Sequence, residues 1–256
     1  VANLFVGDYE MGLLSIARTI PNNVTSIIAT IAPIFTPLFI SYYAKNNIVE
    51  LTNNVKKTIN TMAIILFVPI SGFIVFSYDF YSLWQKSLSS KELILVTALS
   101  TLTVVQAYFN SVTSTMAQIS VVVNKLKAPV FVSLACGIIS IIAEILLIKI
   151  FGLGLYAIVL STTIVMIVRY VVFNSFYAAW CLKLPMSYFI PTALKTWFSI
   201  PVLLGVMLLI RKILPIHSWS GLCIDAIIAG IIGYIFMLII YEHNEINLLS
   251  RRKKDI

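Results

Sequence analysis

Stretches of about twenty apolar residues recur along nearly the whole chain, and this spacing constrains the fold more than any other feature. A helix rises about 1.5 Å per residue, so about 20 residues cross the roughly 30 Å of hydrocarbon in a bilayer. Backbone polar groups must be paired inside lipid, which makes each stretch a helix. We therefore predict an all-α, polytopic transmembrane helix bundle with spans at 15–43, 58–78, 93–123, 129–149, 153–180, 196–213 and 221–241.

The composition supports a membrane protein and argues against a soluble one. Of the 256 residues, 60% are hydrophobic and 11% are charged, whereas a soluble domain carries roughly 25% charged residues. The net charge of +8 does not indicate a nucleic-acid-binding protein, because the basic residues form no stripe interleaved with aromatic residues.

Basic residues predict the orientation. Those of the segments 44–57, 124–128 and 181–195 and of the tail fall on one side of a seven-span bundle, and they outnumber those of the other side by eleven to five. Cytoplasmic loops are enriched in lysine and arginine. The C-terminus is therefore predicted to be cytoplasmic, and Asp8 and Glu10 lie outside. The basic pair Arg211–Lys212 opposes this assignment.

Motifs for enzymatic chemistry are absent from the sequence. It contains no HExxH, GxSxG or P-loop pattern and no usefully spaced pair of carboxylates. The two histidines, His217 and His243, flank the last span on opposite sides, so they cannot share a metal ion. The three cysteines, Cys136, Cys181 and Cys223, form no CxxC pattern. We predict neither an enzyme nor a cofactor or metal site.

Ionisable side chains inside spans are costly and often mark a transport pathway. Arg18 begins the first span, Arg169 lies deep in the fifth, and Glu144 lies in the fourth. The planar fork of arginine suits phosphate groups, so both arginines are candidate contacts for an anionic lipid head group. Two other interpretations remain open: Arg18 snorkels to the interface, and Arg169 forms a buried ion pair with Glu144. Glu144 is either such a partner or an ion-coupling group.

Two further features of the spans bear on transport. The third span places Gln106, Asn110, Ser114 and Gln118 four residues apart, along one helix face. This polar stripe either joins helices by hydrogen bonds or lines a cavity for sugars, whose hydroxyls amides match well. In the first span, Pro21, Pro33 and Pro37 are expected to bend the helix.

Several segments resemble the C-terminal half of the O-antigen type of oligosaccharide flippase, within the multidrug/oligosaccharidyl-lipid/polysaccharide exporter superfamily. The turn with Gly7, Asp8, Tyr9 and Gly12 precedes a long helix that ends in IAPIFTPLFISYYAKN. Four further segments resemble the pattern of this family: KNNIVELTNNVKKTIN, FSYDFYSLWQ with Leu83 and Trp84, VVNKLKAP and FGLGLYAIVLST. The opening VANLFVG is typical of the end of a helix, so we expect a C-terminal portion of a longer protein.

The resemblance implies a two-lobed exporter in which residues 1–180 form the C-terminal six-helix lobe and residues 181–256 add two helices and a basic tail. Such a transporter moves undecaprenyl-pyrophosphate-linked oligosaccharide, an O-antigen or similar repeat unit, from the cytoplasmic to the periplasmic leaflet of the bacterial inner membrane. The implied partners are the lipid-linked oligosaccharide, the missing N-terminal helix bundle and the polysaccharide assembly machinery. Arg18 and Arg169 would meet the pyrophosphate.

Two other functions stay open. A cation-coupled multidrug exporter of the same superfamily would share the fold but favour buried acidic groups, of which Glu144 is the one deep in a span. A polytopic glycan polymerase or ligase should carry a large outer loop with arginines or carboxylates, whereas the longest outer loop, YDFYSLWQKSLSSKE, is short.

Overall fold

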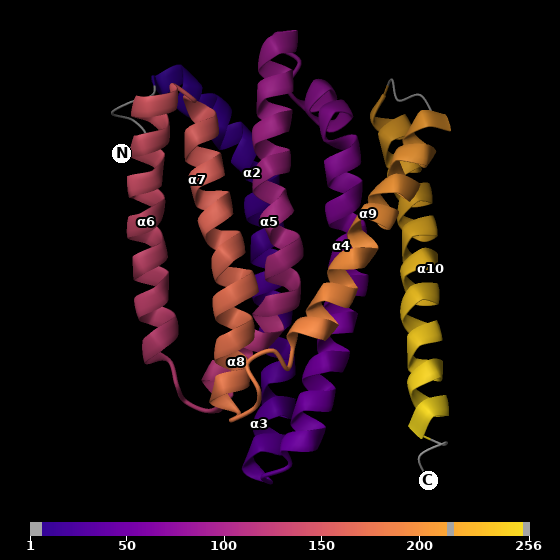
Figure 1. Cartoon of the computed structure of the whole chain (residues 1–256). Helices are drawn as coiled ribbons and strands as arrows, with labels where there is room; N and C mark the ends of the chain where they lie inside the picture. Colours follow the sequence, from indigo (N-terminus) through magenta and orange to yellow (C-terminus); the bar gives the residue numbers. More distant parts are fainter. Residues whose placement is uncertain (1–6, 214–217, 253–256) are drawn as a thin grey trace.

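The computed structural model describes residues 7–213 and 218–252, with side chains placed up to Tyr241 apart from Ile213. The described part is helical throughout (Figure 1). Its elements are α2 (Asp8–Ile31), η1 (Ala32–Phe35), α3 (Thr36–Ala44), α4 (Ile48–Trp84), α5 (Ser90–Val122), α6 (Lys127–Phe151), α7 (Leu155–Val168), η2 (Arg169–Asn174), α8 (Ser175–Cys181), α9 (Ile190–Ile213) and α10 (Trp219–Arg252).

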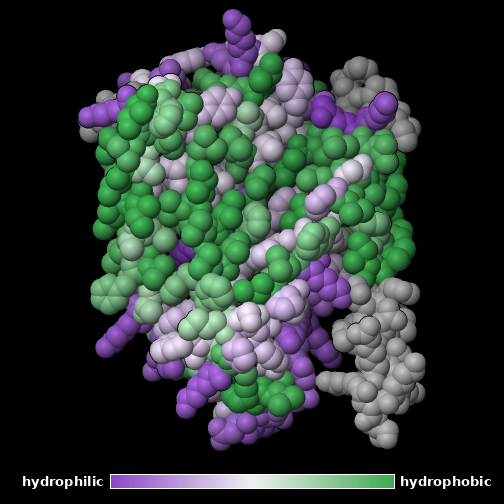
Figure 2. All heavy atoms as spheres, viewed as in Figure 1, coloured by the Kyte–Doolittle hydropathy of each residue, from purple (hydrophilic) through white to green (hydrophobic). Residues whose placement is uncertain are grey.

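Seven helical segments in the described residues are long and apolar enough to cross a membrane, which confirms the predicted polytopic bundle. Successive segments run in opposite directions, so α2 begins at the upper end of the bundle in Figure 1 and α3 ends at the lower end. On the face shown in Figure 2, hydrophobic surface covers most of the middle of the molecule, with hydrophilic side chains gathered toward both ends.

The first span departs from α-helical geometry at one place. The chain passes through Pro21 within α2, and a 3₁₀ turn, η1, then joins α2 to α3. Pro33 and Pro37 stand at the starts of η1 and α3, where a missing backbone N–H costs little. The three prolines therefore produce one local change of helix type, at residues 32–35.

Helix α4 is longer than the sequence indicated. The polar segment near 44–57, predicted as a linker, is helical from Ile48, because the side chain of Asn47 accepts a hydrogen bond from the Glu50 N–H and caps the helix. Leu51 and Val55 in this segment are fully buried. The amphipathic spacing of these apolar residues extends the helix below the membrane-length stretch.

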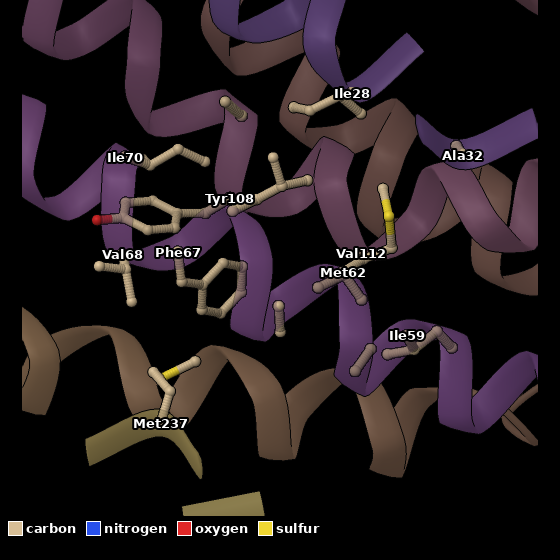
Figure 3. Close-up of a cluster of buried hydrophobic side chains, with 14 of the residues drawn as sticks. Ile28, Ala32, Ile59, Met62, Phe67, Val68, Ile70, Tyr108, Val112 and Met237 are labelled. Carbon is tan, nitrogen blue, oxygen red and sulfur yellow. The ribbon is translucent and has the colours of Figure 1, made fainter. Parts of the chain in front are cut away.

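Helices α9 and α10 pack directly against α4, and the core is continuous across all three. Figure 3 shows Met237 of α10 beside Phe67 and Val68 of α4. At Gly233 an added Cβ would lie 2.7 Å from the terminal methyl group of Met207 of α9, which would have to move, so α10 approaches α9 closely here. These two helices, predicted as an addition to the lobe, share its hydrophobic core.

Different side-chain interactions join the helices at the upper and lower ends of the bundle. At the upper end, the Tyr9 hydroxyl donates to Glu92 and so joins the start of α2 to the start of α5. At the lower end, the Lys56 ammonium lies 4.0 Å from the centre of the Tyr188 ring. The hydrogen bond of Tyr188 with Thr52, together with Lys56, lowers the pKa of the Tyr188 hydroxyl.

The fold places the three predicted basic loops, 44–57, 124–128 and 181–195, at the lower end (Figure 1). Arg211, which opposed the predicted orientation, is an internal partner of α4. Its Nη1 donates to the Val75 carbonyl at 2.9 Å, and its Nη2 lies 2.9 Å from Asp79 Oδ2, in an ion pair without hydrogen-bond alignment. The side chains of Arg251, Arg252, Lys253 and Lys254 lie outside the described residues.

Candidate functional site

Helix α2 carries an exposed polar stripe along a membrane-length helix. The stripe consists of Ser15, Thr19, Asn22, Ser26 and Thr30, all of them exposed. Their spacing of four, three, four and four residues keeps them on one helix face. We call these five residues the α2 stripe. Sequence reasoning missed the stripe, although its helical spacing was a readable signal.

The outer face of α6 provides the contrast. The membrane-length segments Asp8–Ala44, which contains α2, and Lys127–Phe151, which is α6, are equally uncovered: the apolar 18-residue stretch of each is 17% buried. On α6 the exposed residues are large and apolar, such as Phe131, Ile138 and Ile142. Such a face suits lipid chains, whereas a row of hydroxyls and an amide does not. The α2 stripe therefore faces water, a polar ligand or another protein surface.

The hydroxyl groups of the α2 stripe are partly satisfied by their own helix. Ser15, Thr19, Ser26 and Thr30 each donate to the carbonyl four residues earlier, at 2.9 to 3.0 Å. Their oxygens still accept hydrogen bonds, and the structure records no bond to the Asn22 side chain among the residues that it describes. The stripe thus offers acceptors along its length and both donors and acceptors at Asn22.

Arg18 lies at the edge of the α2 stripe, between its exposed face and the buried face of the helix. Ala17 and Pro21 are buried on one side of Arg18, and Asn22 is exposed on the other. Arg18 itself is partly buried, about 15 Å along the helix from Asp8. The structure gives its five donors no hydrogen bond and no ion pair among the described residues. A guanidinium in this setting is available to an anion.

Glu144 of α6 lies close enough to Arg18 for the charge of each to act on the other, although they form no direct ion pair. The Glu144 side chain is 7% exposed, and its Oε1 has no hydrogen-bond partner. One turn earlier, the buried Ser140 hydroxyl also lacks a partner. Two unsatisfied oxygens, one turn apart, therefore face the interior beside Arg18.

The predicted α5 stripe has mixed roles. Gln118 accepts a hydrogen bond from Thr36 of α3 at 3.1 Å, and Ser114 donates to the Ser111 carbonyl. The Gln106 Oε1 is buried without a partner, and no bond to Asn110 is recorded in the described part of the chain. The lower end of this stripe joins helices, while Gln106 and Asn110, which are partly exposed, keep free hydrogen-bonding groups.

Arg169 opens η2, a single π-helical segment between α7 and α8. Its Nη1 contacts the Met166 sulfur at 4.0 Å, and its Nε is buried without a partner. The interpretation of Arg169 as the ion-pair partner of Glu144 is wrong, because no such pair forms. A π-helical turn holds an extra residue and is common at functional sites. Arg169 therefore stays a candidate, and the structure does not bring it to Arg18.

The same π-helical segment ends at a residue that sequence reasoning missed. Asn174 is buried, and its amide donates to Thr113 of α5 at 3.4 Å. A single asparagine six residues before the end of the predicted fifth span, 153–180, gave no periodic signal. This contact fixes the lower part of α7–α8 against α5.

An apolar cavity lies elsewhere, between α4, α9 and α10, with a volume of about 400 Å³. Its walls include Phe73, Phe76 and Phe80, and the hydroxyl of its one tyrosine, Tyr234, donates to the Ile65 carbonyl. A sugar would leave its hydroxyls unpaired there. For a polar substrate, the α2 stripe with Arg18 is the better site.

The described residues contain no group of three or more His, Cys, Asp or Glu that could hold a metal ion. His217 and the side chain of His243 lie outside the described residues. Cys136 and Cys181 are buried, Cys223 is exposed, and all three are free thiols.

Comparison with known proteins finds one distant relative worth reporting. Over 256 residues the chain is 23% identical to EpsK of Bacillus subtilis (strain 168), described as an uncharacterized membrane protein. The alignment covers 99% of this chain and 50% of EpsK, so the chain spans half the length of that relative. No family model matches the chain. No solved structure matches it.

Proposed function

We propose that this multi-pass membrane protein flips undecaprenyl-pyrophosphate-linked oligosaccharide from the cytoplasmic to the periplasmic leaflet by alternating access. The observation that carries the proposal is the α2 stripe, an exposed polar face on a membrane-length helix with an unpartnered arginine at its edge. The proposed activity is transport, without a covalent step or cofactor.

The polar face supports a cavity because exposure to lipid would be costly. The four hydroxyls of the α2 stripe donate to their own helix, but the Asn22 amide has no recorded partner and in hydrocarbon would lose hydrogen bonds worth on the order of 1–3 kcal/mol each. A second helix bundle placed opposite α2 would enclose water and sugar between the two lobes. Serine, threonine and asparagine side chains along such a wall suit sugar hydroxyls, which both donate and accept.

Arg18 supplies the group that a pyrophosphate needs. Its guanidinium stays charged and presents paired donors that match phosphate oxygens. The structure leaves these donors without protein partners. Arg169, Gln106 and Asn110 are further proposed contacts, because each has a polar group that the described residues leave free.

The choice of substrate rests on the sequence resemblance to oligosaccharide flippases, carried by the turn at Gly7–Gly12 and the inner turn at Asn124–Lys127. In this proposal, the described helices form the C-terminal lobe in the bacterial inner membrane, and the lower end of the bundle is cytoplasmic. The polysaccharide assembly machinery would supply and consume the lipid-linked substrate.

One observation favours a second candidate, a cation-coupled multidrug exporter. Buried acidic groups serve ion coupling in membrane transporters, and Glu144 is buried with an unpartnered oxygen. Such an exporter would move small amphipathic cations. The Arg18 charge at the edge of the polar stripe repels cations and favours the anionic substrate.

The deciding experiment measures the leaflet in which labelled lipid-linked repeat units accumulate, in vesicles from the host and from a strain that lacks the gene. We expect the deletion to leave the substrate in the cytoplasmic leaflet. Arg18→Gln should lower the flipping rate about tenfold or more, since a lost charged hydrogen-bond pair is worth about 1.5–3 kcal/mol. Arg18→Lys should lose less.

A matched control is Lys86→Gln, which removes an exposed charge from the loop between α4 and α5. It should flip at the wild-type rate. Normal flipping in the deletion strain, with only the polymer length changed, would contradict the flippase and favour a polymerase.

A further inference from the structure

Pro21 lies inside α2, on the turn that carries Arg18 and Asn22, and the helix continues through it. A proline has no backbone N–H, and its ring crowds the carbonyl four residues earlier, so the Ala17 carbonyl loses its usual partner in the helix. Ala17 is fully buried, so water does not reach this carbonyl. A backbone carbonyl without a hydrogen bond is costly in such a place.

Tyr81 of α4 brings a donor to this place. Its hydroxyl lies 3.4 Å from the Ala17 carbonyl oxygen and 3.5 Å from that of Ile16, and it donates to Ser100 of α5 at 2.9 Å. Tyr81 and Ser100 are both fully buried. A tyrosine hydroxyl has one proton, which is here shared between the serine oxygen and the two carbonyls. Helices α2, α4 and α5 therefore meet at this hydroxyl.

The same arrangement recurs at a second proline. Pro69 lies inside α4, and the carbonyl four residues before it is that of Ile65. The Tyr234 hydroxyl of α10 donates to this carbonyl at 3.1 Å. Two of the three prolines well inside the described helices, Pro201 being the third, thus have a tyrosine from a neighbouring helix at the freed carbonyl. This recurrence indicates that the hydroxyl compensates for the missing N–H.

Pro21 separates two parts of α2 that pack differently. Above it, three apolar residues are buried in a cluster with α4, α5 and α7: Leu13, Leu14 and Ala17. Below it, Ile28 is the one buried residue among residues 22–31. The lower part has little packing of its own to fix its direction. That direction is therefore set at the turn before Pro21, where the Tyr81 hydroxyl acts.

Building on the proposed function, we propose that Tyr81 is a positioning residue for the transport site on α2. Its hydroxyl replaces the N–H that Pro21 lacks and so fixes the direction of the helix on either side. Arg18 and Asn22 each follow one residue of this carbonyl–proline pair, so both keep the orientation in which they meet the substrate. Tyr81 does not itself touch the substrate.

The test measures hydrogen–deuterium exchange of the α2 amides by mass spectrometry, in the protein purified in detergent from its host. Tyr81→Phe removes the hydroxyl alone and keeps the ring contacts with Phe80 and Trp84. We expect the α2 amides near Pro21 to exchange about tenfold faster, because opening the helix there no longer breaks a hydrogen bond to the hydroxyl.

Pro21→Ala distinguishes this role from general packing. It restores an N–H that reaches the Ala17 carbonyl within the helix, so the Tyr81 hydroxyl is no longer needed there. In the Pro21→Ala background, Tyr81→Phe should leave the α2 exchange rates unchanged within about twofold. An equal acceleration in both backgrounds would overturn the proposal.

Two variants serve as matched controls, and melting temperatures confirm that each is folded. Tyr108→Phe removes another buried tyrosine hydroxyl that pairs with a serine, Ser71 at 2.7 Å, and should leave α2 exchange unchanged. Ser100→Ala removes one acceptor but leaves the hydroxyl beside the carbonyls, so α2 should exchange no faster than in wild type. If either control accelerates α2 exchange as much as Tyr81→Phe, the effect does not pass through the Ala17 carbonyl and the proposal is wrong.

The transport assay separates this inference from the proposed function. In vesicles, Tyr81→Phe should raise the apparent KM for labelled lipid-linked repeat units about threefold or more and leave kcat near that of wild type, because binding contacts are misplaced. An unchanged KM despite faster α2 exchange would contradict the positioning role. If the exchange results hold but wild type does not flip the substrate, the hold of Tyr81 on α2 stands and the flippase proposal fails. If wild type flips and Tyr81→Phe leaves α2 exchange unchanged, the reverse is true.

Discussion

Charged side chains within the spans divide into those with a protein partner and those without one. Arg211 is held by the Val75 carbonyl and by Asp79. Arg18 has neither kind of partner, and Arg169 has only a distant thioether contact. A charge in a bilayer costs about 2.5–3.5 kcal/mol on insertion scales. Pairing explains why Arg211 is tolerated, whereas Arg18 needs water or an anionic ligand.

The first prediction concerns the pair of Asp79 and Arg211. Asp79→Asn keeps the shape of the side chain but removes the countercharge of Arg211. We expect the free energy of unfolding to fall by about 1–2 kcal/mol, less than for a fully buried pair because the side chains are 36% and 18% exposed. Thermal melting in detergent measures the change.

The double variant Asp79→Asn with Arg211→Gln serves as the control, because it removes both charges. It should recover part of the lost stability. An unchanged melting temperature for Asp79→Asn alone would show that the pair contributes nothing to stability.

At the scale of elements, α2 and α4 illustrate two kinds of membrane helix. The 18-residue apolar stretch of α4 is 56% buried. Helix α4 is therefore the central helix on which α5, α9 and α10 pack. In the segment Asp8–Ala44, which contains α2, the corresponding 18-residue apolar stretch is 17% buried, and the exposed face of α2 is polar. We expect the exposed polar face of α2 to border polar surroundings, whereas α4 contributes its side chains to the hydrophobic core.

The second prediction tests the surroundings of α2. In a background without Cys223, Thr19→Cys, Asn22→Cys and Ser26→Cys should react with a charged, membrane-impermeant thiol reagent. Ile138→Cys and Ile142→Cys, on the apolar face of α6, should react about tenfold more slowly, because a thiolate does not form in hydrocarbon. Mass spectrometry of the labelled protein follows the reaction. Equal protection of both sets would place the α2 stripe against protein or lipid.

At the scale of the whole molecule, the three basic segments 44–57, 124–128 and 181–195 lie at the lower end, while Arg211 at the upper end is paired with Asp79 within the fold. The structure thereby accounts for Arg211 of the opposing pair, while Lys212 is exposed at that end. Positively charged loops are retained in the cytoplasm, so the lower end is predicted to face it.

The third prediction follows from this orientation. Alkaline phosphatase, which is active only outside the cytoplasm, should be active when fused at Ser87 and inactive when fused at Lys125. A fluorescent protein that folds only in the cytoplasm should give the reverse pattern at the same two positions. Activity of the phosphatase at Lys125 would invert the orientation and with it the proposed direction of transport.

Sequence reasoning reached the helical type and the number of spans, but it was weaker at the ends and faces of helices. The helix at 48–57 was missed because polar residues mask an amphipathic pattern, in which Leu51 and Val55 are buried. The α5 stripe looked uniform, yet Gln118 has a partner on α3 and Gln106 has none. Identical side chains on one face meet different neighbours along the helix.

The sequence by itself determined that the described residues form seven helical segments long and apolar enough to cross a membrane. Backbone hydrogen bonds must close locally in lipid, so apolar length is enough to specify each span. Only the tertiary structure decided which polar groups meet: Arg211 with Asp79, and Asn174 with Thr113. These pairs come from helices far apart in the chain. Their meeting depends on how whole helix surfaces pack, which no local pattern contains.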